Sequence, residues 1–329
     1  MSDASTRLTE TVTPTRLGWL AFILLLAVVP AVTERFWLQT FVQANIFALF
    51  VLSWNLISGQ TSYISFGHSF LIGVAAYTTA ILAAEHGVSP VVSASAGIGL
   101  AVLAGTLVFL PTLRLKGVYF TFVSLLLPII GERVTIARSD LTGGERGIVG
   151  VPQFVDSLAA NYYLSAVLLF ATAYGTWWLV HSKFGEVLAM IRQDEELVET
   201  SGINPEKFKF VAFVLSAFVA GVAGVLNVHY VGTATIGSVL ALPLSINIVI
   251  AAVIGGRGSV PGAIAGAWFY IFFNASVRPF TEAPVRLLSF YIVGILVIGL
   301  FPAGVVPTVR QAVKRLRDDG IDAIPTRAD

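Results

Sequence analysis

The feature that most constrains this chain is a succession of long apolar stretches separated by short polar or glycine-rich segments. A helix needs about 20 largely apolar residues to cross a bilayer, and only a helix satisfies its own backbone groups in lipid when it crosses alone. The chain is also only 12% charged, whereas soluble globular proteins carry about 25%. The candidate spans are 17–34, 38–58, 69–85, 89–111, 117–137, 161–180, 208–230, 241–256, 260–277 and 285–302. We therefore expect an all-α polytopic membrane helix bundle of about ten spans.

Two of these stretches leave alternatives open. The segments 241–256 and 260–277 are short and are separated only by a glycine-rich turn, so they could form two half-helices or one bent hairpin. The first stretch, 17–34, could instead be a signal peptide, but it ends in Thr33-Glu34-Arg35 with no convincing small-residue cleavage site. An uncleaved first span is therefore the favoured interpretation.

The distribution of Lys and Arg predicts the orientation, because cytoplasmic loops are enriched in both. With the N-terminus inside, 14 of the 20 basic residues face the cytoplasm and 6 face the other side. The cytoplasmic set is Arg7, Arg16, Arg114, Lys116, Lys183, Arg192, Lys207, Lys209, Arg257, Arg310, Lys314, Arg315, Arg317 and Arg327. The opposite set is Arg35, Arg133, Arg138, Arg146, Arg278 and Arg286. An even number of spans then places both tails, 1–16 and 303–329, in the cytoplasm.

Two loops are unusually long. The loop 138–160 is glycine-rich and is predicted to be extracytoplasmic. In the cytoplasmic loop 181–207, apolar residues recur at the i, i+3, i+4, i+7 spacing of an amphipathic helix, namely Phe184, Val187, Leu188 and Ile191. An acidic run follows, and then Gly202 resembles a helix stop before Asn204-Pro205 begins the next helix. This loop is therefore predicted to be a short helix–turn structure at the membrane surface.

The polar segment between the second and third stretches, 55–68, predicts a broken or re-entrant helix near residues 59–68. Irregular backbone is tolerated at membrane depth where protein or a water-filled cavity satisfies it, and transporters place substrate sites at such breaks. The N–H groups of a helix beginning near Ser69 would suit a carboxylate. An ordinary polar loop at the cytoplasmic surface explains the same spacing equally well. Ser65, Gly67 and His68 are the candidate residues of a translocation path.

Several function classes lack their sequence signals. The chain has no cysteine, no HExxH or other metal-ligand cluster, and no GxxxxGK[ST] loop for ATP. Its net charge of +1 gives no preference for nucleic acid. An ion-coupled secondary transporter usually places acidic residues inside its spans. Apart from Glu132, which lies near the outer end of 117–137, these stretches contain acidic residues only at their very ends. We therefore expect neither an enzyme nor a directly bound cofactor, and an ion-driven carrier is the less favoured class.

Four blocks of the chain stand out together. They are NLISGQTSYISFGHSFLIGVAAYTTAIL, RLKGVYFTFVSLLL with LTGGERGIVGVP, FGEVLAMIRQDEELVETSGINPEKFKFVAFVLSAFVAGVAGVL and VIGGRGSVPGAIAGAWF. These blocks resemble the LivM-type permease family of branched-chain amino-acid ABC transporters. The blocks occur in the family's order and cover roughly residues 50–302. Two departures concern the segment 60–63, which is more polar than the usual form, and Ala303, where the family usually has Arg. Permeases for urea and short-chain amides share the first block and remain an alternative.

The resemblance implies the permease subunit of an ATP-driven importer with the type II importer fold, in the inner membrane of a prokaryote. Its implied partners are a second homologous permease, two cytoplasmic ATP-binding subunits that would supply ATP hydrolysis, and an extracytoplasmic substrate-binding protein that would meet loop 138–160. The loop 181–207 would be the coupling loop that docks on an ATP-binding subunit. The residues that match the family there are Gly185, Arg192, Glu195, Glu196 and Gly202.

Overall fold

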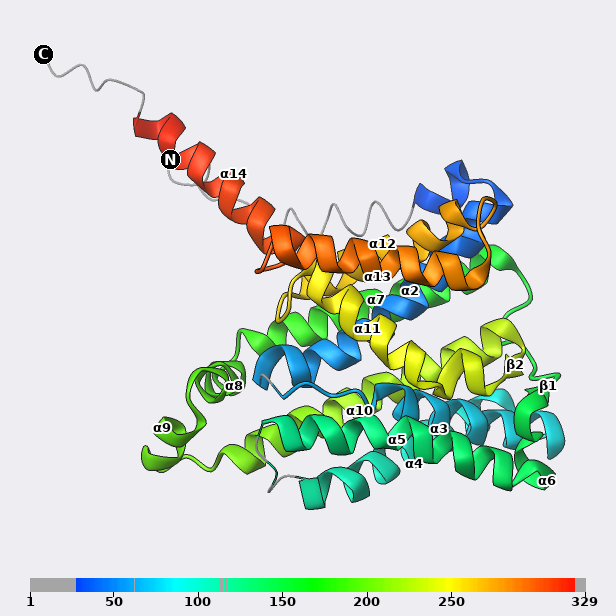
Figure 1. Cartoon of the computed structure of the whole chain (residues 1–329). Coiled ribbons are helices and arrows are strands. Elements are labelled where there is room, and N and C mark those ends of the chain that lie inside the picture. The colour runs from blue at the N-terminus through cyan, green and yellow to red at the C-terminus, as the bar shows by residue number, and fades with distance from the viewer. Residues whose placement is uncertain (1–27, 62, 113–114, 116, 323–329) are drawn as a thin grey trace, which may run out of the picture.

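The computed structural model of the chain describes residues 28–61, 63–112, 115 and 117–322 (Figure 1). Its long helices are α2 (Arg35–Trp54), α3 (His68–Ala80), α4 (Pro90–Thr112), α5 (Val118–Ala137), α7 (Leu158–Val180), α10 (Pro205–Val231), α11 (Leu242–Gly255), α12 (Val260–Val277), α13 (Ala283–Leu300) and α14 (Val305–Asp322). The shorter helices are α6 (Ser139–Thr142), α8 (Lys183–Gln193) and α9 (Glu195–Thr200). Tighter or wider helical turns are η1 (Asn55–Gly59), η2 (Ile81–Glu85), η3 (Gly144–Arg146) and η4 (Ile236–Leu240). The strands β1 (Ile148–Val149) and β2 (Thr233–Ala234) have two residues each.

Within the described residues, nine helical stretches are long and apolar enough to cross a bilayer. They correspond to the second to tenth predicted spans, so the prediction of an all-α polytopic bundle is confirmed. The first predicted span, 17–34, lies mostly outside the described residues, as do the whole of tail 1–16 and the end of tail 303–329.

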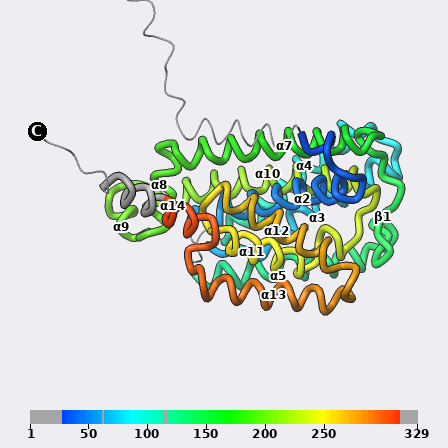
Figure 2. Tube along the Cα trace, turned by 90° about the horizontal axis from the view of Figure 1, so that it is seen from above, coloured from blue at the N-terminus to red at the C-terminus, as the bar shows by residue number. Residues whose placement is uncertain are grey.

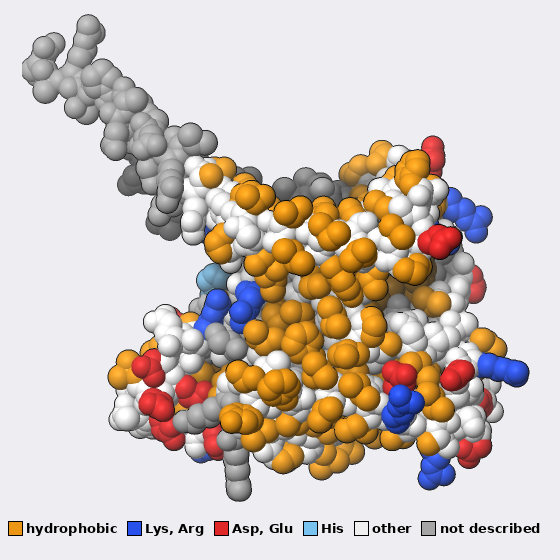
Figure 3. Space-filling view, viewed as in Figure 1, with side chains coloured by type: hydrophobic (Ala, Val, Ile, Leu, Met, Phe, Trp, Pro, Cys, Tyr) orange, Lys and Arg blue, Asp and Glu red, His pale blue; other side chains and the backbone are white. Residues whose placement is uncertain are grey.

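The spans run side by side, and the two ends of the bundle differ (Figures 1 and 2). The helices α8, α9 and α14 gather at one end, which we call the α8–α9 end, and β1 lies at the other. On the face seen in Figure 3, hydrophobic side chains cover the middle and charged side chains collect at both ends. This arrangement matches a protein surrounded by lipid at its waist and by water at its ends. The connections that carry Lys183 and Arg138 lie at opposite ends, as the predicted loop assignment requires.

Helix α2 lies at the centre of the bundle, where other helices surround it. It packs against α7, α10, α11 and α12, and 89% of its most apolar 18-residue window is buried, compared with 11% for the span that begins with α13. A helix without a polar face is stable only where other helices or lipid surround it. The break that follows α2 therefore lies inside the protein, whereas α13 lies at the periphery.

The segment 242–277 forms two separate helices, α11 and α12, joined by the turn Gly256–Ser259. Gly255 and Gly262 let the two backbones touch: a Cβ on Gly262 would lie 2.6 Å from the carbonyl oxygen of Gly255. Small residues permit such close helix packing in membranes. With η4 before α11, both stretches are long enough to cross a bilayer, so the eighth and ninth predicted spans are two separate helices of spanning length.

The loop 138–160 is folded onto the end of α10. Its strand β1 pairs antiparallel with β2, with Ile148 opposite Ala234. The ring of His229 lies 2.6 Å from the carbonyl oxygen of Pro152 through Nδ1 and 3.8 Å from the ring of Phe154. These contacts give the predicted extracytoplasmic loop a defined shape.

Candidate functional site

The predicted helix break is present and buried. Helix α2 continues through η1 to Thr61, residues 63–67 are irregular, and α3 begins at His68. Thr61 is 1% exposed and Ser65 is 3% exposed. A solvated surface loop would expose its polar residues, so that alternative interpretation is wrong. The segment is an irregular stretch that is buried at Ser65 and Gly67 and half-buried at Tyr63, Ile64 and Phe66.

Side chains from neighbouring elements satisfy the backbone of this irregular stretch. The indole Nε1 of Trp54 donates to the carbonyl of Ser65 at 2.7 Å. The N–H of Ser65 donates to Ser58 Oγ at 3.1 Å, and the N–H of Phe66 donates to Ser124 Oγ of α5 at 3.0 Å. An unpaired backbone group away from water costs several kcal/mol. These three side chains therefore make the break possible inside the bundle.

The start of α3 is less open to a carboxylate than its sequence indicates. The N–H of Ser69 donates to Ser245 Oγ at 3.0 Å, and the N–H of Phe70 donates to the carbonyl of Gly67 at 3.1 Å. Two donors of the first turn are thus occupied by protein in this conformation. A bound carboxylate would have to displace Ser245 to reach the first of them.

His68 connects three helices. It is fully buried, and its Nε2 lies 2.9 Å from Ser216 Oγ of α10. Ser216 donates its single hydroxyl hydrogen to the carbonyl of Ser53 at 2.6 Å. In the contact between His68 and Ser216, Nε2 of His68 must therefore be the donor. This arrangement fixes α2, α3 and α10 to one another at the break.

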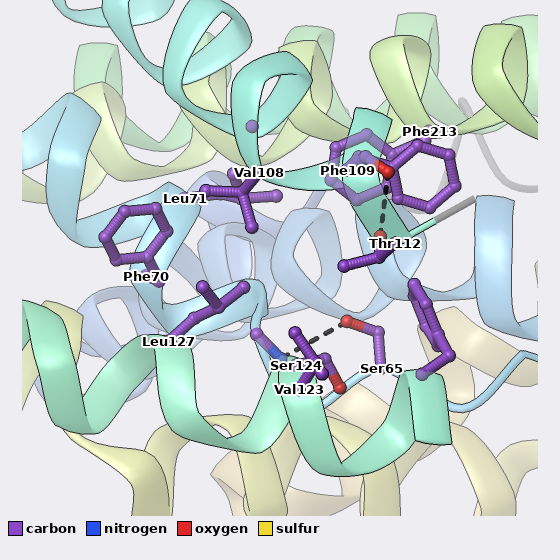
Figure 4. A pocket seen from close by; sticks show the side chains of 13 residues that line it. Ser65, Phe70, Leu71, Val108, Phe109, Thr112, Val123, Ser124, Leu127 and Phe213 are labelled. Atoms are coloured by element: carbon purple, nitrogen blue, oxygen red, sulfur yellow. Dashed lines mark hydrogen bonds between the residues drawn. The ribbon is translucent and has the colours of Figure 1, made fainter. Parts of the chain in front are cut away.

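Ser65 and Gly67 do line a cavity, between α3, α4, α5 and α10 (Figure 4). Its wall is mostly apolar and includes Phe109, Phe120 and Phe213, with Ser65 among the few hydroxyls. A water-sized sphere can be centred in only about 20 Å³ of it, which is room for one or two water molecules. The cavity is therefore closed to a solute as large as an amino acid in this conformation.

The predicted amphipathic helix of the coupling loop is α8, and α9 follows it. Leu188 and Ile191 are buried at 1% and 3% exposure, whereas Met190 is 44% exposed. Gly185 packs against the end of α7, where a Cβ would come within 2.6 Å of the carbonyl oxygen of Leu179. Gly202 follows α9 with φ +82°, a conformation that glycine adopts without strain. Both glycines thus shape the loop through backbone geometry.

Two arginines hold the end of the broken helix. Arg192 of α8 donates through Nη1 to the carbonyl of Gly59 at 2.9 Å. Arg257, in the turn between α11 and α12, donates through Nη2 to the carbonyl of Ser58 at 3.4 Å. Cations are favourable at the negative end of a helix dipole. Burial and, to a lesser degree, the positive charge of Arg192 lower the pKa of Arg257 from its usual value.

A second junction joins α9 to the irregular stretch. Glu195 forms an ion pair with Lys209 of α10 at 2.7 Å, and their side chains are 18% and 3% exposed. The hydroxyl of Tyr63 donates to the other oxygen of Glu195 at 2.6 Å and lies 3.2 Å from Lys209 Nζ. Burial, the hydrogen bond to Glu195 and its negative charge raise the pKa of Tyr63 far above its usual value. Tyr63 therefore remains a neutral hydrogen-bond donor.

The predicted coupling residues consequently differ in position. Glu195 points into the protein, whereas Glu196 is exposed on α9. Both line a shallow open pocket with Arg192 and Tyr63. The structure thus brings the predicted coupling loop together with the helix break, a proximity that the sequence did not indicate.

Tyr63 and Lys209 were missed as site residues. A lysine near the start of the apolar stretch 208–230 was a usable signal, because a charge there needs a partner. No local pattern indicated that the partner would be Glu195.

Asn55 offers a direct test of how the turn between α11 and α12 is held. Its Oδ1 accepts the N–H of Gly258 at 2.8 Å, and Asn55 is completely buried. We expect Asn55→Leu to cost about 1–3 kcal/mol of unfolding free energy, because a buried N–H loses its acceptor. Thermal unfolding of the purified protein measures this. Asn227→Leu is the control, since Asn227 is half-buried and its side chain has no hydrogen bond to the described residues; an equal loss in both variants would contradict the prediction.

Comparison with known proteins identifies the family. The sequence profile described as "Branched-chain amino acid transport system / permease component" matches residues 36–300. The permease protein LivM of the Escherichia coli K12 high-affinity branched-chain amino acid transport system is 26% identical to this chain. The similarity covers 90% of this chain and 76% of the length of LivM. The Salmonella typhimurium LivM is 24% identical over 91% of this chain and 76% of its own length.

More distant similarity covers only part of the chain. The Escherichia coli K12 permease protein LivH, of the same named transport system, is 27% identical over 40% of this chain and 42% of its own length. The autoinducer 2 import system permease protein LsrC of Escherichia coli is 27% identical over 39% of this chain and 40% of its own length. No solved structure matches the chain at a significant level. The profile covers most of the chain, including the helix break and its contacts with α8 and α9. The protein therefore belongs to the family of branched-chain amino-acid transport system permeases.

Proposed function

We propose that this chain is one translocation subunit of an ATP-driven importer for branched-chain amino acids, with its α8–α9 end in the cytoplasm and both tails inside. The observation that carries the proposal is the junction between α8–α9 and the helix break. Arg192 and Glu195 of the exposed helix pair reach directly to Gly59 and Tyr63. A protein that pushes on α8–α9 would therefore act on the segment that lines the cavity.

The proposed partners follow from this arrangement. The exposed surface of α8 and α9 includes Met190 and Leu197, which are 44% and 64% exposed outside the spans. Covering such exposed apolar side chains with a partner removes apolar area from water, which is favourable. Two cytoplasmic ATP-binding subunits would dock there, a second permease of the LivM or LivH kind would complete the path, and a substrate-binding protein would meet loop 138–160. ATP would be bound by the partner subunits alone.

The small cavity supports transport by alternating access instead of tight substrate binding. It admits no amino acid in this conformation, so the cavity would open only when the helices move. Its apolar wall suits an aliphatic side chain, and its few hydroxyls offer little for a urea or amide group. Branched-chain amino acids are therefore preferred over urea and short-chain amides as the cargo.

An ion-coupled carrier is the alternative of a different class. Among the nine described spans, the acidic residues lie at or near the span ends, as Glu132 does in Val118–Ala137. Proton and sodium relays usually require several buried ionisable groups. The described spans therefore favour an externally driven permease.

Reconstitution distinguishes the two classes. The chain would be purified with its co-encoded partners and placed in vesicles with the substrate-binding protein, and leucine uptake would be measured with and without internal ATP. We expect uptake that requires ATP. Uptake by this chain alone under a proton or sodium gradient would overturn the proposal, and a preference for urea or amides over leucine would overturn the substrate assignment.

A further inference from the structure

Tyr63 contacts three different parts of the α8–α9 end. Its hydroxyl bonds to Glu195 of α9, and the ammonium group of Lys209 of α10 lies 4.5 Å from the centre of its ring. The same ring meets that of Phe120 of α5 edge to face, with centres 5.4 Å apart. One side chain thus joins the coupling loop to two of the helices that surround the cavity.

From Tyr63, aromatic contacts continue into the cavity wall. Phe120 lies edge to face with Phe109 of α4 at 5.8 Å, and Phe109 stacks on Phe213 of α10 at 3.9 Å. All three phenylalanines line the cavity. A second connection runs along the chain, because Ser65, two residues after Tyr63, lines the same cavity. Close-packed interiors transmit displacements between neighbouring side chains, so a shift of Tyr63 would reach the cavity by both routes.

The chemistry of the junction favours a positional role over a purely stabilising one. The Lys209 side chain is 3% exposed and its partner Glu195 is 18% exposed. Replacing a buried ion pair with apolar residues of similar volume is often neutral or stabilising. Leucine at position 195 and methionine at position 209 would thus give similar stability. The charged pair and the tyrosine hydroxyl, in contrast, hold α9 in one defined position against the break.

We infer that Tyr63 is a positioning residue of the transport cycle: the Glu195–Tyr63–Lys209 cluster transmits movement of α9 to the aromatic wall of the cavity. The inference rests on the proposed function, because it requires a partner that moves α8 and α9. When the cluster is intact, α9 and residues 63–67 move together. When the hydroxyl is removed, α9 moves and the cavity wall does not follow.

The test is the ratio of leucine uptake to ATP hydrolysis in the complete complex, reconstituted in vesicles. Tyr63→Phe keeps the ring and its packing but removes the hydroxyl. We expect hydrolysis within about twofold of the unmodified complex and uptake per ATP lowered about tenfold, since one hydrogen bond to a charged group is lost. Tyr119→Phe is the matched control, because Tyr119 lies on α5 beside Phe120 and is 72% exposed. An unchanged ratio in Tyr63→Phe would overturn the inference.

A second readout separates this inference from the proposed function. The natural chain has no cysteine, so Leu127→Cys places a single thiol of this chain in the cavity wall. We expect ATP to change the alkylation rate of that thiol in the complex, and Tyr63→Phe to abolish the change. If leucine uptake fails but the ATP-dependent change persists and requires Tyr63, the proposed cargo is wrong and the transmission is right. If Tyr63→Phe fails to assemble, the double variant Glu195→Gln, Lys209→Met takes its place; an alkylation change that survives it refutes the cluster.

Discussion

Glu195→Ala is expected to be among the most destabilising substitutions at the α8–α9 end, although a glutamate in a loop usually tolerates replacement. It would leave the ammonium group of Lys209 buried, with its side chain 3% exposed in the intact protein and its carboxylate partner gone. Breaking a buried ion pair on one side costs about 3–5 kcal/mol. We expect a corresponding loss of unfolding free energy, which the fluorescence of the chain's six tryptophans would follow during denaturation.

Two variants make this result specific. Glu199→Ala changes the same residue type in the same helix at an exposed position, and surface substitutions usually stay within about 0.5 kcal/mol. The double variant Glu195→Ala, Lys209→Met removes the stranded charge and is expected to recover most of the stability. Equal effects of Glu195→Ala and Glu199→Ala, or a double variant as unstable as the single one, would show that the ion pair is not buried in the working protein.

Gly262→Ala is expected to separate α11 from α12. The added Cβ would lie 2.6 Å from the carbonyl oxygen and 3.0 Å from the carbonyl carbon of Gly255, and these are backbone atoms that cannot rotate away. Overpacking of this kind costs about 1–3 kcal/mol. Because the turn that follows Gly255 carries Arg257 and Gly258, the contacts of both residues with η1 would weaken as well.

Gly175→Ala is the matched control for this substitution. Gly175 lies within α7, and a Cβ there would meet no atom within 4 Å. Alanine is favoured over glycine inside a helix by about 1 kcal/mol, so the control is expected to be neutral or stabilising. Thermal unfolding and the yield of folded protein from membranes measure both variants. A Gly262→Ala protein as stable as Gly175→Ala would mean that the two helices are farther apart than described.

The junction changes what substitutions in the coupling loop can report. The resemblance to the LivM-type family predicts that both Glu195 and Glu196 contact an ATP-binding subunit. In the structure Glu196 is exposed, whereas Glu195 is engaged with Lys209 and Tyr63. Loss of transport in a Glu195 variant would therefore reflect a displaced α9, and Glu196 is the better probe of docking.

Much of the local structure was predictable because its causes are local. Apolar runs of sufficient length become helices in lipid wherever they pack, and the described spans follow those runs closely. The spacing of Leu188 and Ile191 predicted α8 and its buried face. The helix stop at Gly202 was also predictable, since only glycine takes a positive φ at little cost.

The candidate site was predictable only in part. The sequence located the helix break and proposed Ser65, Gly67 and His68 together. The structure places Ser65 and Gly67 at the cavity but assigns His68 to a hydrogen bond with Ser216 of α10. Ser216 is 148 residues away along the chain, and no pattern within one helix indicates which distant hydroxyl will meet a buried imidazole.

What the sequence by itself determined is therefore the class of protein: an all-helical membrane bundle with a break after its second predicted span and a folded loop at one end. The length and hydropathy of a stretch and the conformation of a glycine depend on about 20 neighbouring residues or fewer. They can therefore be recognised directly in the sequence. Only the tertiary structure decided that the break and the loop form one junction, through Arg192 with Gly59 and Glu195 with Tyr63 and Lys209. Charges buried beside lipid must find partners wherever packing brings them, and packing is a property of the whole bundle.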